Sequence, residues 1–312
     1  MTQTALILGA SGRFGRNVAE AFWNAGWRVH IFDRRTGDLS QAACGVDVIV
    51  NGWNPPYTKW ASQLPGLTDQ VIAAAKSSGA TVILPGNVYV YGPDAPEPFG
   101  PGVSHAAQNT LGRLRAEMEE RYRTAGIRCI VLRAGDFLDT EASGNWFDRV
   151  MAAPLKNGRL KYPGDPDVPH AWAYLPDVAR ATVALAERRA DLPDHAEIAF
   201  PGYTLTGKQL AGMTELAVGW KLRIQRMSWL SIRLAQPFWP MARHLLETRY
   251  LWFKPHRMDP KSFDTVLPGF VETDPVKALG RAIAPILREE SDRPKPTDED
   301  QHPLPTARHQ RA

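Results

Sequence analysis

The sequence predicts an α/β fold built on a doubly wound parallel sheet. Short apolar runs alternate with amphipathic stretches through the first half of the chain, which is typical of parallel strands joined by crossover helices. In addition, a glycine-rich turn, GASGRFG at residues 9–15, stands between the apolar run at 5–8 and a helical pattern. Strand, glycine turn and helix in this order open a Rossmann-type dinucleotide-binding unit.

The glycine turn is the most specific motif of the chain. A side chain at its glycine positions would keep the backbone away from a pyrophosphate or push the helix off the strand. The amides at the helix start face an anion with the positive end of the helix dipole. The turn therefore predicts a dinucleotide site, with the candidate residues Gly9, Ser11, Gly12, Arg13, Phe14 and Gly15.

The next elements bear on the form of the dinucleotide. Helical spacing of apolar residues follows the turn, and the strand at 27–32 ends in Asp33. An acid at this position accepts hydrogen bonds from the adenosine ribose and repels a 2′-phosphate, which favours NAD. Arg34, Arg35 and Arg13 could instead clamp the phosphate of NADP. NAD is the expected cofactor and NADP stays open, with Asp33 and Arg34 as further candidates.

The pattern then continues through further strands and helices. Strands are predicted at 47–50, 81–84, 127–132, 170–174 and 197–200, and helices ending near Lys76, over 109–122, over 176–188 and from Thr206 to near Gly219. The loop Asn51, Gly52 and Trp53 directly follows a strand and is added to the cofactor candidates, because the carboxyl ends of parallel strands line the crevice.

One connection is too short for the usual arrangement. Only thirteen residues, 34–46, separate Asp33 from Asp47, where a doubly wound half normally holds a helix and an edge strand. We therefore predict a sheet shortened at residues 34–46, with a more open adenine side.

Composition is that of an ordinary soluble globular protein. The 312 residues are 44% hydrophobic and 22% charged, without an apolar run long enough to span a membrane. No signal peptide is evident, and the two cysteines, Cys44 and Cys129, have no metal-ligand partner nearby. These features indicate a cytoplasmic protein without a metal site.

The segment 221–261 is basic and aromatic. It contains nine Lys/Arg against Glu247 and Asp259, with six interleaved Trp, Tyr and Phe side chains. An anionic substrate, an acidic partner or nucleic acid would suit it, but helices with aromatic faces on the core and solvated basic side chains explain it more simply. Neither nucleic acid nor a membrane is expected as a partner.

The chain is predicted to divide into three regions. Residues 1–135 form the main dinucleotide-binding domain, and 136–288 combine later sheet elements with a small C-terminal substrate lobe. The region 289–312 is charged, contains prolines and is predicted to be disordered.

Several motifs resemble the extended short-chain dehydrogenase/reductase superfamily, which includes NAD-dependent sugar epimerases and dehydratases. The glycine turn, the sequence Val90-Tyr91-Gly92, Arg133 at the end of a strand and the run LPDVARA at 175–181 match landmarks of that group. The resemblance implies a Rossmann domain whose C-terminal lobe closes over a substrate.

The catalytic residues of that superfamily are missing. Its Tyr-x-x-x-Lys pair, which exchanges a proton while nicotinamide exchanges a hydride, corresponds here to Asn109 and Arg113, and its serine corresponds to Asn87. A Tyr-x-x-x-Lys string at 250–254 is interpreted as coincidence. Tyr91 is the first candidate for the proton donor, whereas His105 is expected to be a bystander.

The substrate is not identified by the sequence. The superfamily's nucleotide-sugar enzymes carry an asparagine where this chain has Asp136, and a carboxylate disfavours a diphosphate. By position, Asp136, Trp146, His170 and Tyr174 are predicted to line the pocket. We expect an NAD(P)-dependent oxidoreductase or epimerase/dehydratase-like enzyme for a small molecule, with a homodimer considered. The alternative is a catalytically inactive NAD(P)-binding regulator or redox sensor.

Overall fold

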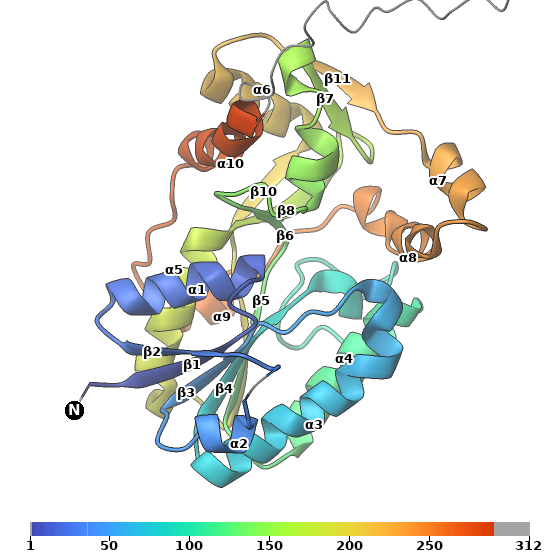
Figure 1. The fold of residues 1–312 in the computed structure, drawn as a ribbon. Helices are drawn as coiled ribbons and strands as arrows, with labels where there is room; N and C mark the ends of the chain where they lie inside the picture. The colour runs from blue at the N-terminus through green and yellow to red at the C-terminus, as the bar shows by residue number, and fades with distance from the viewer. Residues whose placement is uncertain (1, 36, 290–312) are drawn as a thin grey trace, which may run out of the picture.

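The computed structural model describes residues 2–35 and 37–289, and it contains the predicted parallel sheet (Figure 1). Six parallel strands lie in the order β2-β1-β3-β4-β5-β9, which is the doubly wound arrangement. Their bounds are β1 Thr4–Leu8, β2 Arg28–Phe32, β3 Val48–Asn51, β4 Thr81–Gly86, β5 Cys129–Arg133 and β9 His195–Ala199. The fold class predicted from the sequence is confirmed.

Helices cover both faces of this sheet. On one face α1 (Arg13–Asn24) packs against α5 (Leu175–Glu187), and on the other α3 (Trp60–Ser78) packs against α2 (Leu39–Ala42) and α4 (Thr110–Thr124) (Figure 1). Each face has its own core of buried side chains, with Val18 and Val178 in one and Val71 and Met118 in the other. Continuous apolar strands such as β1 suit a sheet that is buried on both sides.

The shortened connection is also confirmed. Among the described residues between β2 and β3, the only regular element is the four-residue helix α2, capped by the Asp38 side chain. The strand β2 is consequently the edge of the sheet, and Ile31 on it is 65% exposed.

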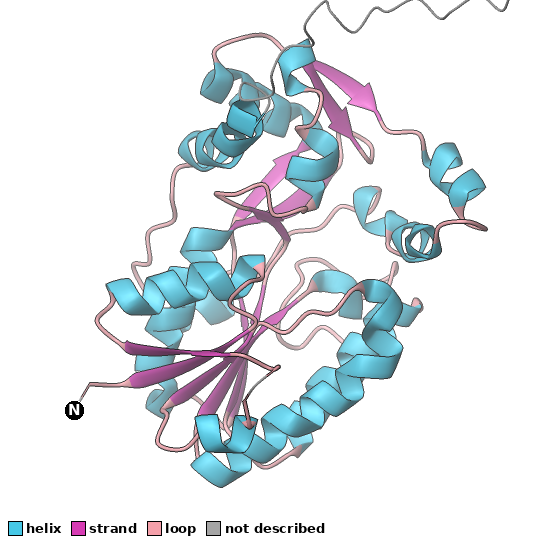
Figure 2. Ribbon diagram, viewed as in Figure 1, coloured by secondary structure: helices cyan, strands magenta, loops and turns pink. Residues whose placement is uncertain are grey.

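A second, smaller part stands above the carboxyl ends of the strands (Figure 2). The strands β6 (Asp136–Leu138), β8 (Pro169–Tyr174) and β10 (Tyr203–Thr206) form one sheet, and β7 (Arg159–Tyr162) pairs with β11 (Arg223–Arg226). Around them lie α6 (Gly207–Val218), α7 (Trp229–Ala235), α8 (Pro240–Glu247) and α10 (Pro275–Glu289). We call this part the lobe.

The chain returns from the lobe to the main sheet. Strand β9 is the last strand of the main sheet, and the helix α9 (Lys261–Val266) packs against this strand. The domain limits at residues 135 and 288 stay a prediction, and the tail predicted to be disordered lies outside the described residues from 290 onward. In the described part of the chain, no helix is long and apolar enough to cross a membrane.

Candidate functional site

The glycine turn folds tightly because three backbone segments meet there. Gly9 has φ +75° and accepts the Gly12 amide at 2.9 Å. A Cβ on Gly15 would collide with the carbonyl of Gly9, and one on Gly52 would lie 2.7 Å from the carbonyl oxygen of Leu8. The glycines therefore bring the ends of β1 and β3 and the start of α1 into direct contact.

The start of α1 is chemically open to an anion. Its N-cap, Gly12, supplies no side-chain acceptor, the first turn contains no acidic residue, and Ser11 is exposed. First-turn amides without a capping side chain bind water or an anionic ligand. Arg13 points elsewhere in this structure, because its guanidinium donates to the carbonyl of Ser143 at 2.8 Å.

A second candidate cofactor surface lies at the end of β2. Asp33 accepts two side-chain hydrogen bonds from Arg35, at 3.1 and 2.8 Å, and these bonds lower the pKa of its carboxyl to about 2. Arg34 stands 5.8 Å above the ring of Trp53, which also contacts Phe32. A hollow of about 220 Å³ lies between Arg34 and the α3 residues Gln63, Gly66, Leu67 and Gln70.

The loop after β3 is fixed from within. The Asn51 side-chain amide donates to the Tyr122 hydroxyl at 2.9 Å, and its oxygen accepts the Trp53 amide at 3.2 Å. Asn51 is buried, so it shapes the loop that carries Gly52 and Trp53.

Three of the candidate catalytic side chains make local backbone contacts. Asn87 accepts the amide of Tyr89 at 3.0 Å, and Asn109 caps α4 by accepting the amide of Gly112 at 2.7 Å. Arg113 is exposed and donates to the carbonyl of Gln108. The contacts of Asn87 and Asn109 stabilise a turn and a helix start, which are common structural roles of asparagine.

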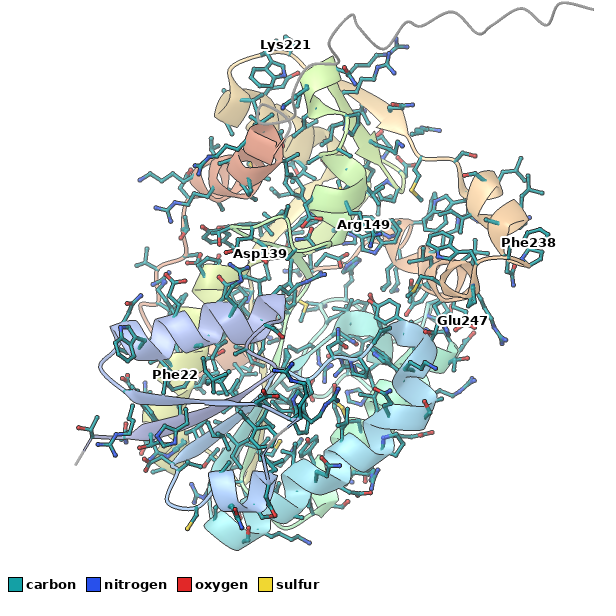
Figure 3. All side chains as sticks on the ribbon, viewed as in Figure 1. Phe22, Asp139, Arg149, Lys221, Phe238 and Glu247 are labelled. Atoms are coloured by element: carbon teal, nitrogen blue, oxygen red, sulfur yellow. The ribbon has the colours of Figure 1, made fainter. Side chains whose placement is uncertain are left out.

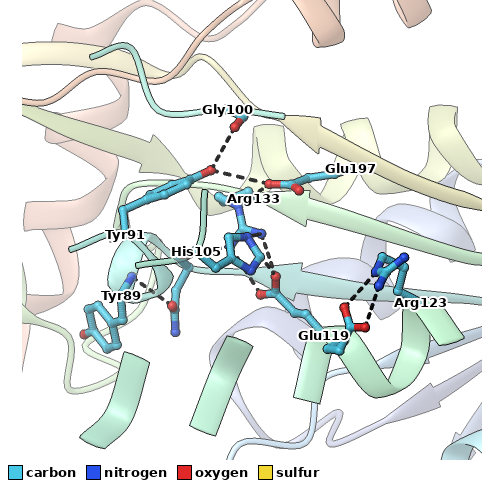
Figure 4. A network of polar contacts seen from close by, with 10 residues as sticks. Tyr89, Tyr91, Gly100, His105, Glu119, Arg123, Arg133 and Glu197 are labelled. Carbon is cyan, nitrogen blue, oxygen red and sulfur yellow. Dashed lines mark hydrogen bonds and ion pairs between the residues drawn. The ribbon is translucent and has the colours of Figure 1, made fainter. Parts of the chain in front are cut away.

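Tyr91, the first candidate proton donor, is fully buried. Its hydroxyl donates to the Gly100 carbonyl at 3.2 Å and lies 3.4 Å from Glu197 (Figure 4). Its ring stacks on Phe99 at 4.4 Å, and the Arg133 guanidinium lies 5.3 Å from it. Burial raises the pKa of this phenol.

Arg133 is the centre of the buried network drawn in Figure 4. It donates to Glu119 at 2.6 Å, to Glu197 at 2.7 Å and to the Asn87 carbonyl at 2.6 Å. Burial alone would lower the pKa of Arg133. The nearby negative charges, that of Glu119 above all, outweigh this effect and raise the pKa. His105 lies 3.3 Å from Arg133, and burial together with that charge lowers its pKa. The network ties the turn after β4 to β5 and β9.

A pair of tyrosines that the sequence reasoning missed lies nearby. The hydroxyls of Tyr57 and Tyr89 are 2.9 Å apart, and each residue belongs to a short 3-10 turn just after β3 or β4. Burial raises both pKa values, and the charge of Asp136 raises them further. The available signal was position, because both follow strands that end at the predicted crevice.

Two predicted substrate residues do meet in the lobe. His170 Nε2 lies 2.7 Å from Asp136 Oδ2, and the His170 ring stacks on Trp252 at 4.3 Å. Trp146 joins this group, with its ring 5.3 Å from that of Trp252. Tyr174 does not, since it is buried in the lobe core at the far end of β8.

His256 completes the cluster behind His170. It is fully buried, its ring is 4.4 Å from that of His170, and its Nδ1 contacts the Lys254 carbonyl at 3.0 Å. Burial and the neighbouring His170 lower its pKa to about 3, so the ring is neutral at neutral pH. No group of side chains in the described residues has the composition of a metal site.

Comparison with known proteins identifies the fold. No model of a protein family and no curated protein matches this sequence. Among solved structures, UDP-glucuronic acid 4-epimerase from Bacillus cereus, in complex with UDP-glucuronic acid and NAD, is similar with a TM-score of 0.72 and 15% identity, over 92% of this chain and 100% of that one.

Two further structures give the same result. UDP-N-acetylglucosamine 4-epimerase from Bacillus cereus has a TM-score of 0.71 and 14% identity, over 91% of this chain and 99% of that one. PA4631, a nucleoside-diphosphate-sugar epimerase from Pseudomonas aeruginosa, has a TM-score of 0.69 and 15% identity, over 93% of this chain and 99% of that one. The chain thus has the fold of nucleotide-sugar epimerases. At 14–15% sequence identity, the roles of individual residues cannot be transferred from those proteins to this one.

Proposed function

We propose that this protein binds NAD at the carboxyl ends of β1 and β3 and acts as an epimerase/dehydratase-like oxidoreductase on a small molecule. The observation that carries the proposal is the glycine turn, where Gly9, Gly15 and Gly52 bring the backbone together and leave the start of α1 uncapped. Such a cradle accepts a pyrophosphate. NAD, when bound, supplies hydride exchange. The similar Bacillus cereus epimerase was solved with NAD, which supports the proposal.

Asp33 supports NAD over NADP. Its carboxyl is ionised throughout the physiological range, since hydrogen bonds from Arg35 hold its pKa at about 2. A carboxylate at the end of β2 repels a 2′-phosphate. Arg35 is already paired with that carboxylate, and Arg13 is held by the Ser143 carbonyl.

For the proton we propose Tyr89, assisted by Tyr57, in place of Tyr91. The hydroxyl of Tyr91 is occupied by the Gly100 carbonyl and Glu197. The hydroxyl of Tyr89 instead meets that of Tyr57, on the loops that follow β3 and β4. Burial first of all raises the pKa of Tyr89, which keeps the phenol protonated but makes it a weaker acid, so the proposal depends on the position of its hydroxyl beside that of Tyr57.

A binding experiment tests the cofactor site. Calorimetric titration with NAD⁺, NADH, NADP⁺ and NADPH is expected to show binding of the NAD forms. Ser11→Glu, which adds a carboxylate at the exposed start of α1, is expected to weaken binding at least about tenfold by charge repulsion. Ser62→Glu, at the exposed start of α3, is the matched control and is expected to leave binding unchanged. Equal effects of the two variants would contradict the site.

A second experiment tests the proton donor. In single-turnover assays with bound reduced cofactor over a panel of carbonyl compounds and sugars, Tyr89→Phe is expected to slow hydride transfer about 100-fold or more. Tyr91→Phe is expected to be much milder. The opposite order would return the role to Tyr91. Tight dinucleotide binding without turnover on any substrate would favour the regulator or sensor.

A further inference from the structure

Helices α7 and α8 and their link form a hairpin at residues 229–247, in which α8 packs against α4 and the 3-10 turn Tyr57–Lys59 while α7 projects outward (Figure 1). Four large apolar side chains on it face solvent: Leu230 is 61% exposed, Leu234 68%, Phe238 91% and Trp239 44%. Leu230 and Leu234 are four residues apart on one face of α7, and Phe238 projects at the outer end (Figure 3). Several large apolar side chains exposed on one short hairpin indicate an interaction surface.

Apart from Glu247, which ends α8 and pairs with Arg243 at 3.1 Å, the charged side chains of this part of the sequence are cationic. Between Glu215 and Glu247 the sequence contains no Asp or Glu, and it contains five Lys/Arg. Arg223, Arg226 and Arg233 of this set are exposed, on β11 and α7. Arg233 thus shares α7 with the exposed leucines, and Arg226 precedes this helix in the sequence by three residues, so the cationic character of the segment favours an anionic partner.

We propose that the α7–α8 hairpin is a peripheral membrane-binding surface for anionic phospholipid. Leu, Phe and Trp side chains enter the boundary between headgroups and acyl chains, while arginines beside them bind lipid phosphates. A second copy of the chain fits less well, because a two-fold contact would bring two predominantly cationic surfaces together. Phe238 at a protruding end suits insertion into a soft layer.

This inference revises one expectation from the sequence. The sequence predicts no membrane partner, and within residues 2–35 and 37–289 no helix could cross a membrane; a hairpin that lies on the membrane surface needs no such helix. The basic, aromatic character of residues 221–261 is then only partly explained by packing. Trp229 and Trp252 are buried, and Ile232, Leu245 and Leu246 pack against the lobe core, whereas the four exposed apolar side chains of the hairpin face outward.

The test is co-sedimentation with vesicles. The full-length protein is expected to bind vesicles of phosphatidylcholine with about 30 mol% phosphatidylserine at least about tenfold more tightly than pure phosphatidylcholine, and less tightly as salt is raised. L234S/F238S and R226Q/R233Q are each expected to reduce binding at least about tenfold. Trp23→Ser on α1, where the side chain is 71% exposed, is the matched control and is expected to bind normally.

Three results would overturn the proposal. These are no binding to either vesicle, equal binding to both, and a concentration-dependent dimer in light scattering that L234S/F238S abolishes. Because the substituted side chains are exposed, an unchanged melting temperature is expected for every variant and shows that each is folded.

Discussion

Replacing Arg133 by methionine is expected to lower the free energy of unfolding by about 3–5 kcal/mol, because it leaves buried carboxylates without their counter-charge. The Arg133 side chain is fully buried, and its main partner, Glu119, is 4% exposed at 2.6 Å. Glu197, at 2.7 Å, is 20% exposed and retains more solvent. The variant also removes the hydrogen bond to the Asn87 carbonyl, on the turn that carries Tyr89. Most of the loss therefore comes from stranding Glu119.

Urea denaturation followed by tryptophan fluorescence at neutral pH measures this loss. Arg128→Met is the matched control, since that arginine forms a surface pair with Asp194 at 3.5 Å and is expected to cost less than about 1 kcal/mol. Adding Glu119→Gln and Glu197→Gln to the Arg133 variant is expected to recover much of the loss, because the stranded charges disappear. The reasoning is refuted if Arg133→Met costs no more than the surface control, or if the added substitutions recover nothing.

Three further predictions follow from the geometry. Gly15→Ala is expected to lower the free energy of unfolding in urea by about 1–3 kcal/mol and to abolish NAD binding, because the added Cβ would collide with the backbone of Gly9. In the control Gly66→Ala, on α3, the added Cβ meets no other atom, and the variant is expected to be more stable by up to about 1 kcal/mol. Asp33→Ser is expected to raise affinity for NADP⁺ at least about tenfold in calorimetry by freeing Arg35; unchanged affinity would reject this role. The pKa of His256 is lowered to about 3 in the folded state, so the unfolded state alone takes up its proton between about pH 6.5 and 3. Stability is thus expected to fall as pH falls, by up to about 1.4 kcal/mol per pH unit, and His256→Asn should flatten that dependence in urea titrations.

The fold was largely predictable because its signals are local. The glycine turn and the apolar runs identified β1, α1, β2, β3, β4 and β5 from a few residues each, and the short connection at 34–46 predicted the missing edge strand. The capping box of Thr206 and Gln209 likewise places the start of α6 where the sequence predicted a cap. Each of these features depends on residues within one turn or one strand.

The candidate site was less predictable because its contacts join distant segments. Tyr57 and Tyr89 are 32 residues apart, and Asp136 and His170 are 34 apart. Tyr91 was favoured by its motif, but the 3-10 turn at Val88–Val90 separates the surroundings of Tyr89 from those of Tyr91. The partner of each tyrosine hydroxyl depends on the geometry of this turn, which the motif alone does not specify.

The proposed chemistry depends on how the lobe sits on the sheet. Asn109 and Arg113 make backbone contacts and offer no acid or base in this structure. The other candidate groups come from the main sheet and from the lobe. The tyrosine pair follows β3 and β4 of the main sheet, whereas Asp136 and its partner His170 lie on β6 and β8 of the lobe. A substrate held between them would be aligned only when the two parts are in register. Substitutions in the lobe core are therefore expected to reduce turnover more than dinucleotide affinity, because the backbone of the glycine turn lies between β1 and α1 and only side chains such as Arg13 reach the segment after β6.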